Sequence, residues 1–317
     1  MNYISQFYLQ FRRQLTIKKY DKLALAVIFV VPIILGFMSG LVFLTDTAND
    51  GSGDYFFSLN EQYSAFAFML IITSIFLGLL ISIVEIIKER HILEKEKMFG
   101  ISVLSYYSAK FVLLAIFSLV QVILLYSIAS YILEVPQNLF LNNIFILYIV
   151  SINSIALGLL ISSYTKSLLV AYNMISILIL PQLLLGGGFI PFDSMSSKLK
   201  FFDEPKSGKM LIIAKFLPAA WAYEDMMVSS YIKTKGWGQN ELLKNLEVEE
   251  KSLDEYMSKQ KTINFAGFQT NIATSIYNKL ILIIESFAFI VMTLLILSKY
   301  RIKFNLGWHY FTSPKIT

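Results

Sequence analysis

The sequence predicts an all-α integral membrane protein with six transmembrane helices, and three observations lead to this fold class. Of the 317 residues, 56% are hydrophobic and only 15% are charged, whereas soluble domains are about 45–50% apolar and about 25% charged. The apolar residues gather into runs of roughly 20 residues, the length that a helix needs to cross a bilayer. Lysine and arginine concentrate on alternate connections between these runs. This pattern excludes a soluble enzyme and a disordered or fibrous chain.

Six segments are long and apolar enough to span the membrane. In chain order they are residues 23–45, 63–87, 111–133, 144–164, 167–189 and 280–298. Before the first span, Ile4, Tyr8 and Leu15 recur at helical spacing, with Arg12 and Arg13 at other positions. This pattern predicts a basic amphipathic helix that lies along the inner membrane interface, within residues 1–22. The alternative is a positively charged flank without a fixed helix.

The charges flanking the spans predict that both termini are cytoplasmic. The first 22 residues carry five cations, the loop after the first span carries acidic residues and no lysine or arginine, and residues 88–97 are again rich in lysine. Cytoplasmic loops carry such an excess of lysine and arginine. Residues 190–279 are expected to be external, and they hold eleven lysines and eleven acidic residues between positions 193 and 261. Long loops are largely exempt from the charge rule, so this segment is interpreted as a folded external element.

Residues 85–100 alternate opposite charges with aliphatic side chains, including Ile86, Ile92 and Leu93. Charges of opposite sign at these spacings support a helix, which would continue the second span beyond the bilayer. Gly100 is suited to the left-handed conformation that often ends a helix. We therefore expect residues 23–189 to form five spans, with a projecting helix at 88–100 between the second and the third.

Polar side chains inside the predicted spans are candidates for a function, because they are costly in lipid. They are Gln121, Asn153, Asn173, Gln182 and Glu285. Hydrogen bonds between helices are the simpler explanation for the amides. Glu285 is expected to pair with Lys279 or with a helix end, and substrate binding is the alternative. No metal site is predicted, since the chain has no cysteine and its two histidines, His91 and His309, lie far apart in the sequence. No catalytic residue is assigned.

Several motifs resemble the ABCG-like export permeases, the group of the white-pigment and pleiotropic-drug-resistance transporters and their bacterial relatives. The first is the run EIIKERHILEKEKMFGISVLSYYSAK at 85–110, with its Glu89-Arg90 pair, charged cluster, Gly100, Ser105-Tyr106 and Lys110. The second consists of Pro181-Gln182, the glycines at 186–188, Ile190-Pro191, Leu217-Pro218, Trp221, Tyr223 and Glu224. The segment Asp21-Lys22-Leu23-Ala24 after the amphipathic helix is similar too. The resemblance covers nearly the whole chain.

The resemblance implies the membrane subunit of an ATP-driven exporter that moves an apolar or amphipathic substrate outward through a cavity at a dimer interface. The second subunit would be another copy of this chain or a paralogous permease. A nucleotide-binding loop needs the pattern G-x-x-x-x-G-K-[ST], and the chain has only Ser207-Gly208-Lys209-Met210. We therefore expect the ATP-binding subunit to be a separate chain that holds ATP and magnesium, while this chain binds no cofactor and no nucleic acid. The absence of cysteines and of glycosylation sequons favours a bacterial inner membrane.

The resemblance also implies roles for individual residues. The contact with the ATPase would be made by Glu89, Arg90, Glu94, Glu96 and Phe99; the substrate cavity would be lined by Phe66, Phe68, Met69, Asn173, Met174 and Ile177; and the external gate would be Phe189 and Ile190, next to re-entrant helices in 190–279. The simpler alternatives are a salt-bridged helix end that touches only water and side chains that face lipid.

The sequence is also compatible with two other classes of function. One is an ATP-independent six-span channel or secondary transporter, although no regularly spaced arginines and no TVGYG-like filter occur. The other is a non-transporting membrane sensor or scaffold that acts through the external segment.

Overall fold

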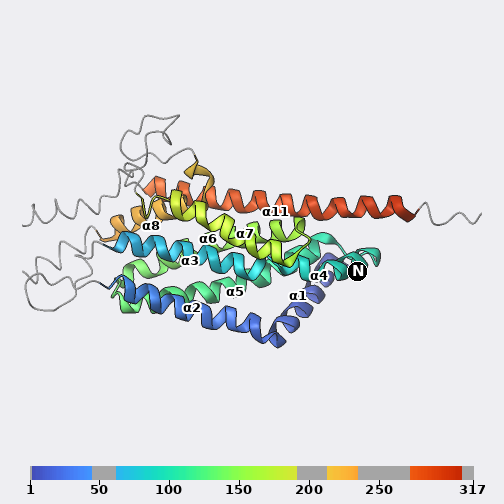
Figure 1. Ribbon diagram of the computed structural model, residues 1–317, viewed down its shortest axis with the longest axis horizontal. Helices are drawn as coiled ribbons and strands as arrows, with labels where there is room; N and C mark the ends of the chain where they lie inside the picture. Colours follow the sequence, from blue (N-terminus) through green and yellow to red (C-terminus); the bar gives the residue numbers. More distant parts are fainter. Residues whose placement is uncertain (1, 45–61, 191–212, 235–271, 309–317) are drawn as a thin grey trace, which may run out of the picture.

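The computed structural model describes residues 2–44, 62–190, 213–234 and 272–308, and these residues form helices and no strand. The helices are α1 (Tyr3–Tyr20), α2 (Lys22–Val42), α3 (Tyr63–Ser82), α4 (Glu85–Met98), α5 (Val103–Ile132), α6 (Gln137–Tyr164), α7 (Leu168–Leu185), the short 3₁₀ helix η4 (Ala214–Phe216), α8 (Pro218–Thr234) and α11 (Ile272–Trp308). The long helices run side by side in one bundle (Figure 1). The predicted all-α membrane fold is confirmed.

Six segments of the described residues are long and apolar enough to cross a membrane. They are Lys22–Val42, Tyr63–Met98, Val103–Ile132, Gln137–Tyr164, Leu168–Leu185 and Ala273–Ser298. Three of these helices begin earlier than predicted, at Val103 instead of residue 111, at Gln137 instead of residue 144 and at Ile272 instead of residue 280. The added turns carry Tyr106, Lys110 and Lys279, whose polar atoms bind other helices of the bundle instead of water. Hydropathy alone underestimates the length of such a helix, because it scores these polar side chains as if they were solvated.

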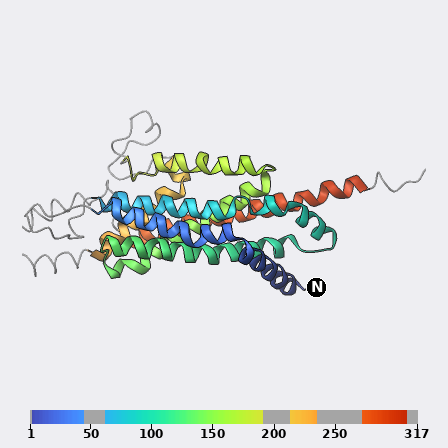
Figure 2. The ribbon, with the colours of Figure 1, turned by 60° about the horizontal axis from the view of Figure 1, so that its bottom comes forward.

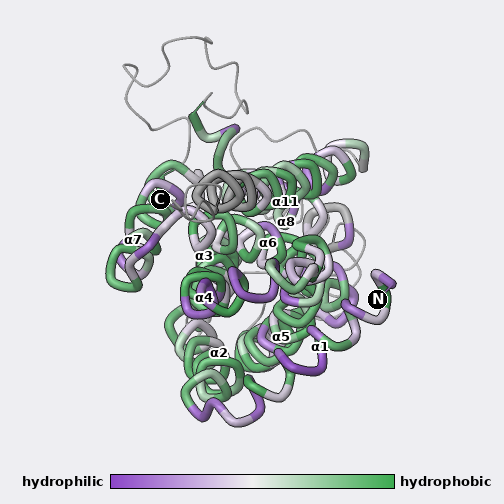
Figure 3. Tube along the Cα trace, turned by 90° about the vertical axis from the view of Figure 1, so that its right-hand side faces the viewer, coloured by the Kyte–Doolittle hydropathy of each residue, from purple (hydrophilic) through white to green (hydrophobic). Residues whose placement is uncertain are grey.

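The bundle is built around α3. In the most apolar part of the span that begins with α3, 83% of the residues are buried, compared with 17% in α7. Gly78 of α3 and Gly158 of α6 lie where the two helices cross, and a Cβ atom on either would collide with Ser151 or Ser82 of the other helix. Small residues allow this close approach of backbones. By contrast, α7 lies along one side of the bundle, separated from α2 (Figures 2 and 3).

The two ends of the bundle differ. One end, called the α4 end below, carries α1, α4 and the last turns of α11; the opposite end carries α8 and is called the α8 end (Figure 1). Helix α1 leaves α2 at a corner formed by Asp21, whose carboxylate accepts hydrogen bonds from the amides of Leu23 and Ala24. It then crosses the α4 end and packs on α5. Most of the predicted external element, at 191–212 and 235–271, and the tail from 309 lie outside the described residues.

Candidate functional site

Helix α4 ends sharply and the chain turns back into α5. Gly100 has φ +82°, a conformation that costs little without a Cβ atom. Its amide donates to the carbonyl of Lys97 at 3.1 Å, and the amide of Ile101 donates to the carbonyl of Glu96 at 3.1 Å. These bonds form the left-handed cap that the sequence predicts at Gly100. A turn at 83–84 separates α4 from α3, so α4 is a helix of its own at the end of the span.

The inner side of α4 carries two buried carboxylates, Glu85 and Glu89, which share one buried ammonium group. The Nζ atom of Lys110 lies 3.2 Å from Glu85 Oε2 and 3.0 Å from Glu89 Oε2, and this lysine is only 1% exposed. The hydroxyl of Tyr106, one turn away on α5, donates to Glu89 Oε2 at 3.1 Å. A buried charge is tolerated when it is paired and hydrogen-bonded in this way. The pairs therefore fix α4 against α5.

Helix α1 completes this network from the other side. Its polar residues meet Glu85, Glu89 and Glu96 in antiparallel order. The Nζ atom of Lys18 lies 2.5 Å from Glu85. The side-chain amide of Gln14 donates to Glu89 at 2.6 Å, and that of Gln10 donates to Glu96 at 3.0 Å. Arg13 pairs with Glu96 and also lies 3.7 Å from Glu89. The charges balance, because three cations (Arg13, Lys18 and Lys110) face three carboxylates. We call these residues, with Tyr106, the charged network.

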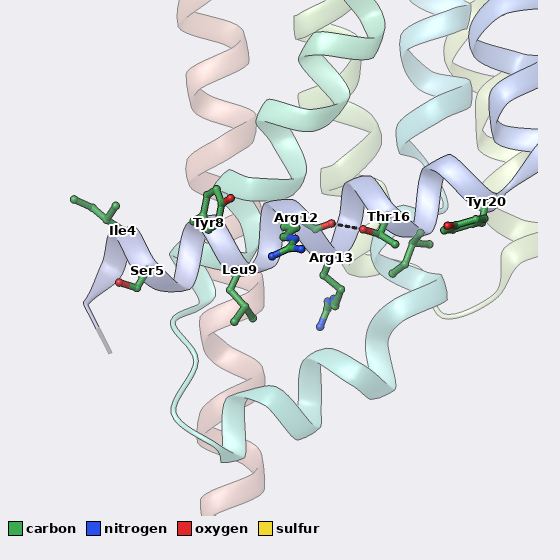
Figure 4. Close-up of a pocket in the computed structure, with 9 residues that line it drawn as sticks. Ile4, Ser5, Tyr8, Leu9, Arg12, Arg13, Thr16 and Tyr20 are labelled. Carbon is green, nitrogen blue, oxygen red and sulfur yellow. Dashed lines mark hydrogen bonds between the residues drawn. The ribbon is translucent and has the colours of Figure 1, made fainter.

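The opposite side of α1 is apolar and exposed. Gln10 and Gln14 are buried, whereas Ile4 is 77% and Tyr8 64% exposed, the reverse of a helix in a soluble protein. In Figure 4, Ile4 and Tyr8 point away from α4, whereas Arg13 points toward it. The outer surface of α1 is open, and its exposed apolar side chains also include Leu9 and Ile17. A helix with its polar side on protein and its apolar side free is suited to a lipid interface.

The five residues expected to contact an ATPase divide into two groups. Glu89 and Glu96 belong to the charged network, and Arg90 donates to the carbonyls of Ser162, Ser163 and Thr165 at 2.8–3.3 Å, at the end of α6. These three residues hold α4 in place. Glu94 and Phe99 are exposed, Phe99 by 86%, together with Ile92 and Met98. The available surface of α4 is therefore more apolar than the sequence suggests.

The role of α1 in this site was not predicted from the sequence. Gln10 and Gln14 are spaced four residues apart and face the protein, and Lys18 continues the same stripe. That spacing was the available signal, because a glutamine stripe beside the apolar residues of an amphipathic helix indicates a second contact. Lys110 lay within the motif of the resemblance, but its two carboxylate partners depend on the packing of α4 on α5.

The six residues expected to line a substrate cavity divide between the core of the bundle and the exposed side of α7. Phe66 and Phe68 are fully buried in the core, and Met69 is half-buried. Asn173 and Ile177 are exposed on α7, and Met174 is half-buried. The rings of Phe66 and Phe43 lie 6.1 Å apart in an edge-to-face contact. The prediction of a shared cavity is not tested by this arrangement, because a second subunit would change what α7 faces.

Of the two residues expected to form a gate, Phe189 and Ile190, the first lies against Phe68. The ring centroids of Phe189 and Phe68 are 5.6 Å apart, and Tyr223 of α8 contacts the same ring from 5.4 Å. Phe189 and Ile190 are about half exposed. A Cβ atom on Gly186 would lie 2.7 Å from the Phe68 ring, and one on Gly188 would overlap it. The glycines therefore let the chain after α7 pass directly over Phe68.

This close approach gives a testable prediction. Gly188→Ala is expected to destabilise the protein by about 1–3 kcal/mol, the usual cost of overpacking, because its methyl group would meet the Phe68 side chain. The measurement is the thermal unfolding midpoint in detergent. In a Phe68→Leu background, Gly188→Ala should lower the unfolding midpoint less than it does in the parent chain, since the smaller leucine side chain leaves space for the added methyl group. Equal effects of the alanine in both backgrounds would contradict the contact.

The polar residues inside the spans mainly connect helices. Gln121 donates to the carbonyl of Val27 at 3.1 Å, joining α5 to α2. Asn153 donates to the carbonyl of Leu282 at 3.2 Å and to Glu285 at 3.3 Å, joining α6 to α11. Lys279 pairs with Asp225 of α8 at 2.9 Å, so it is not the partner of Glu285. In the described part of the chain, no three His, Cys, Asp or Glu residues are grouped to hold a metal ion.

Comparison with known families identifies the chain. The family described as ABC-2 type transporter, the membrane domain ABC2_membrane, matches residues 5–229, from α1 into α8 and more than half of the chain. No curated protein matches the sequence. The chain therefore belongs to the ABC-2 type transporter family: it is a multi-pass membrane protein and the permease part of an ABC transporter, distinct from the ATPase.

Proposed function

We propose that this permease is the membrane subunit of an ABCG-like exporter, driven by an ATP-binding subunit on a separate chain that docks on α4. The observation that carries the proposal is the two-sided character of α4. Its inner side is fixed to α1, α5 and α6 by the charged network and Arg90, whereas Ile92, Met98 and Phe99 are exposed. A helix that transmits force from a motor needs both an anchored side and an accessible one.

The charges at the α4 end support an orientation with this end in the cytoplasm. Helix α1 begins there and α11 runs out there (Figure 1), and Arg12, Lys19, Lys22, Lys88 and Lys95 are all exposed in this region. Such an excess of lysine and arginine favours the cytoplasmic side. We therefore assign both termini and α4 to the cytoplasm, in keeping with a bacterial inner membrane and with a cytoplasmic ATPase that holds ATP and magnesium.

A second permease subunit would cover α7. This helix is the least buried of the six spans, and it exposes Asn173 and Ile177. Two copies that face each other through this side, or one copy and a paralogue, would enclose a path lined by these residues. The gate at Phe189 and Ile190 would lie at its outer mouth. Apart from Asn173, the exposed side chains of α7 are mainly apolar, including Val170, Ile177 and Leu180, and this favours an apolar or amphipathic substrate. The outward direction is inferred from the resemblance to ABCG-like exporters.

Co-purification tests the proposal directly. The permease should be isolated with a stoichiometric ATP-binding chain when it is purified from its native membrane in mild detergent, and ATP hydrolysis should depend on that chain. The permease purified alone should hydrolyse no ATP. Reproducible absence of an ATP-binding partner, with transport retained in vesicles without ATP, would favour a channel or secondary transporter instead. Absence of both partner and transport would favour a membrane sensor or scaffold.

A further inference from the structure

A small cavity with one apolar and one charged wall lies at the α4 end, where α1, α2, the junction of α3 and α4, α5 and α7 meet. Its volume is about 170 Å³. Val27, Ile28, Leu80, Ile81, Leu114 and Phe117 form the apolar wall. The charged wall consists of Lys18, Asp21, Glu85 and Lys88, and Tyr172 of α7 lies at the side. None of the functions described above uses this space.

The four charged residues of this wall balance one another, two lysines against two carboxylates, and the surplus positive charge comes from lysines at its rim. Glu85 is already neutralised by Lys18 at 2.5 Å and Lys110 at 3.2 Å. The carboxylate of Asp21 accepts from two amides at the start of α2. Lys88 is exposed and forms no ion pair within the described residues. Lys19 and Lys22 are exposed at the same corner, so the rim attracts an anion.

The position of the cavity indicates where that anion comes from. The apolar wall belongs to membrane spans, and the adjoining outer faces of α1 and α2 expose large apolar side chains such as Ile17 and Phe29. From the cavity, the acyl chains would continue along these exposed apolar faces of α1 and α2. The volume corresponds to about six water molecules at roughly 30 Å³ each, enough for a phosphate and the glycerol carbons but not for a whole lipid.

We propose that this cavity is a binding site for an anionic phospholipid of the leaflet at the α4 end. The phosphate lies near Lys88, the glycerol carbons pack on the apolar wall, and the acyl chains remain in the bilayer. Anionic lipids are attracted to basic residues at the membrane surface. The bound lipid would bridge the corner between α1 and α2 to the first turn of α4, and thereby stabilise the position of α4. This inference requires only that the chain spans a membrane, so it stands apart from the proposed export function.

The test uses the purified permease in a neutral detergent. Thermal unfolding and native mass spectrometry are followed during titration with phosphatidylglycerol, phosphatidylcholine or glycerol 3-phosphate. Phosphatidylglycerol should raise the unfolding midpoint saturably and remain bound. Lys88→Gln should weaken this response about fivefold, the effect of one basic residue near a membrane surface. Lys95→Gln, an exposed lysine on the same helix away from the cavity, should leave it unchanged.

A second pair of variants tests the shape of the site. Ala24→Phe would fill the cavity that Ala24 lines and should abolish the response, whereas Ala26→Phe, on an exposed part of α2, should preserve it. Equal responses of the Lys88→Gln and Lys95→Gln variants would overturn the proposal, as would an equal effect of phosphatidylcholine. Full stabilisation by glycerol 3-phosphate alone would overturn the assignment to a lipid and indicate a soluble phosphate ligand.

Discussion

Replacing Lys110 with methionine is expected to be among the most damaging single substitutions in the permease. Lys110 is 1% exposed and lies within 3.2 Å of both Glu85 and Glu89. Methionine would occupy a similar volume but would leave these carboxylates with less positive charge in a buried place. Removing one partner of a buried ion pair typically costs about 3–5 kcal/mol. The expected result is a large fall in the thermal unfolding midpoint and in the yield of folded protein.

Two further variants make this prediction specific to the network. Lys95→Met removes an exposed lysine from α4, and a surface substitution of this kind usually changes stability by less than about 0.5 kcal/mol. Combining Lys110→Met with Glu89→Gln should recover part of the loss, because Lys18 and Arg13 then face Glu85 and Glu96 and no carboxylate is left unpaired. If Lys110→Met were as stable as Lys95→Met, the charged network would not be what holds α4.

Phe99→Asp is expected to uncouple the permease from the proposed ATP-binding subunit without unfolding the permease. Phe99 is 86% exposed at the end of α4, so a charge there should cost little stability in the isolated chain. At the centre of an interface, loss of an aromatic anchor costs about 2 kcal/mol or more, which corresponds to roughly thirtyfold in affinity. The measurements are binding of the ATP-binding subunit and ATP-dependent transport in reconstituted vesicles.

The control for Phe99 is an exposed aromatic at the opposite end of the bundle. Tyr131 is 85% exposed at the end of α5, and Tyr131→Asp should leave binding of the ATP-binding subunit unchanged. Normal binding and transport by Phe99→Asp would overturn docking at this end of α4, whereas a fall in unfolding midpoint larger than that of Tyr131→Asp would assign Phe99 a structural role instead.

Charge reversal at Glu89 or Arg90 should behave differently from Phe99→Asp. Both residues bind other helices of the same chain, Glu89 through Lys110, Gln14 and Tyr106, and Arg90 through the carbonyls at the end of α6. We therefore expect Glu89→Lys and Arg90→Glu to lower the unfolding midpoint of the permease alone and to impair coupling as a consequence. If these variants lost ATP-dependent transport but kept the unfolding midpoint of the parent permease, the two side chains would instead belong to the contact with the ATP-binding subunit.

Hydropathy and charge predicted most of the membrane fold. The six apolar runs became the six spans, and Gly100 ends α4 with the positive φ that its lack of a side chain permits. These features depend on neighbouring residues along the chain, and a helix in lipid must satisfy its backbone hydrogen bonds internally. The start of α5 was predicted too late, because the burial of Tyr106 and Lys110 depends on partners from α4.

The sequence by itself determined the number of spans, the amphipathic helix α1 and the position of the charged helix α4, since each follows from periodicity and local composition. Only the tertiary structure decided which charges of α4 remain available. Glu89 and Glu96 are equally polar in the sequence, but antiparallel packing of α1 turns both inward. Likewise, only packing places Phe68 in the core and Phe189 against it. Contacts between distant segments set these roles, and a pattern along one helix does not encode its neighbours.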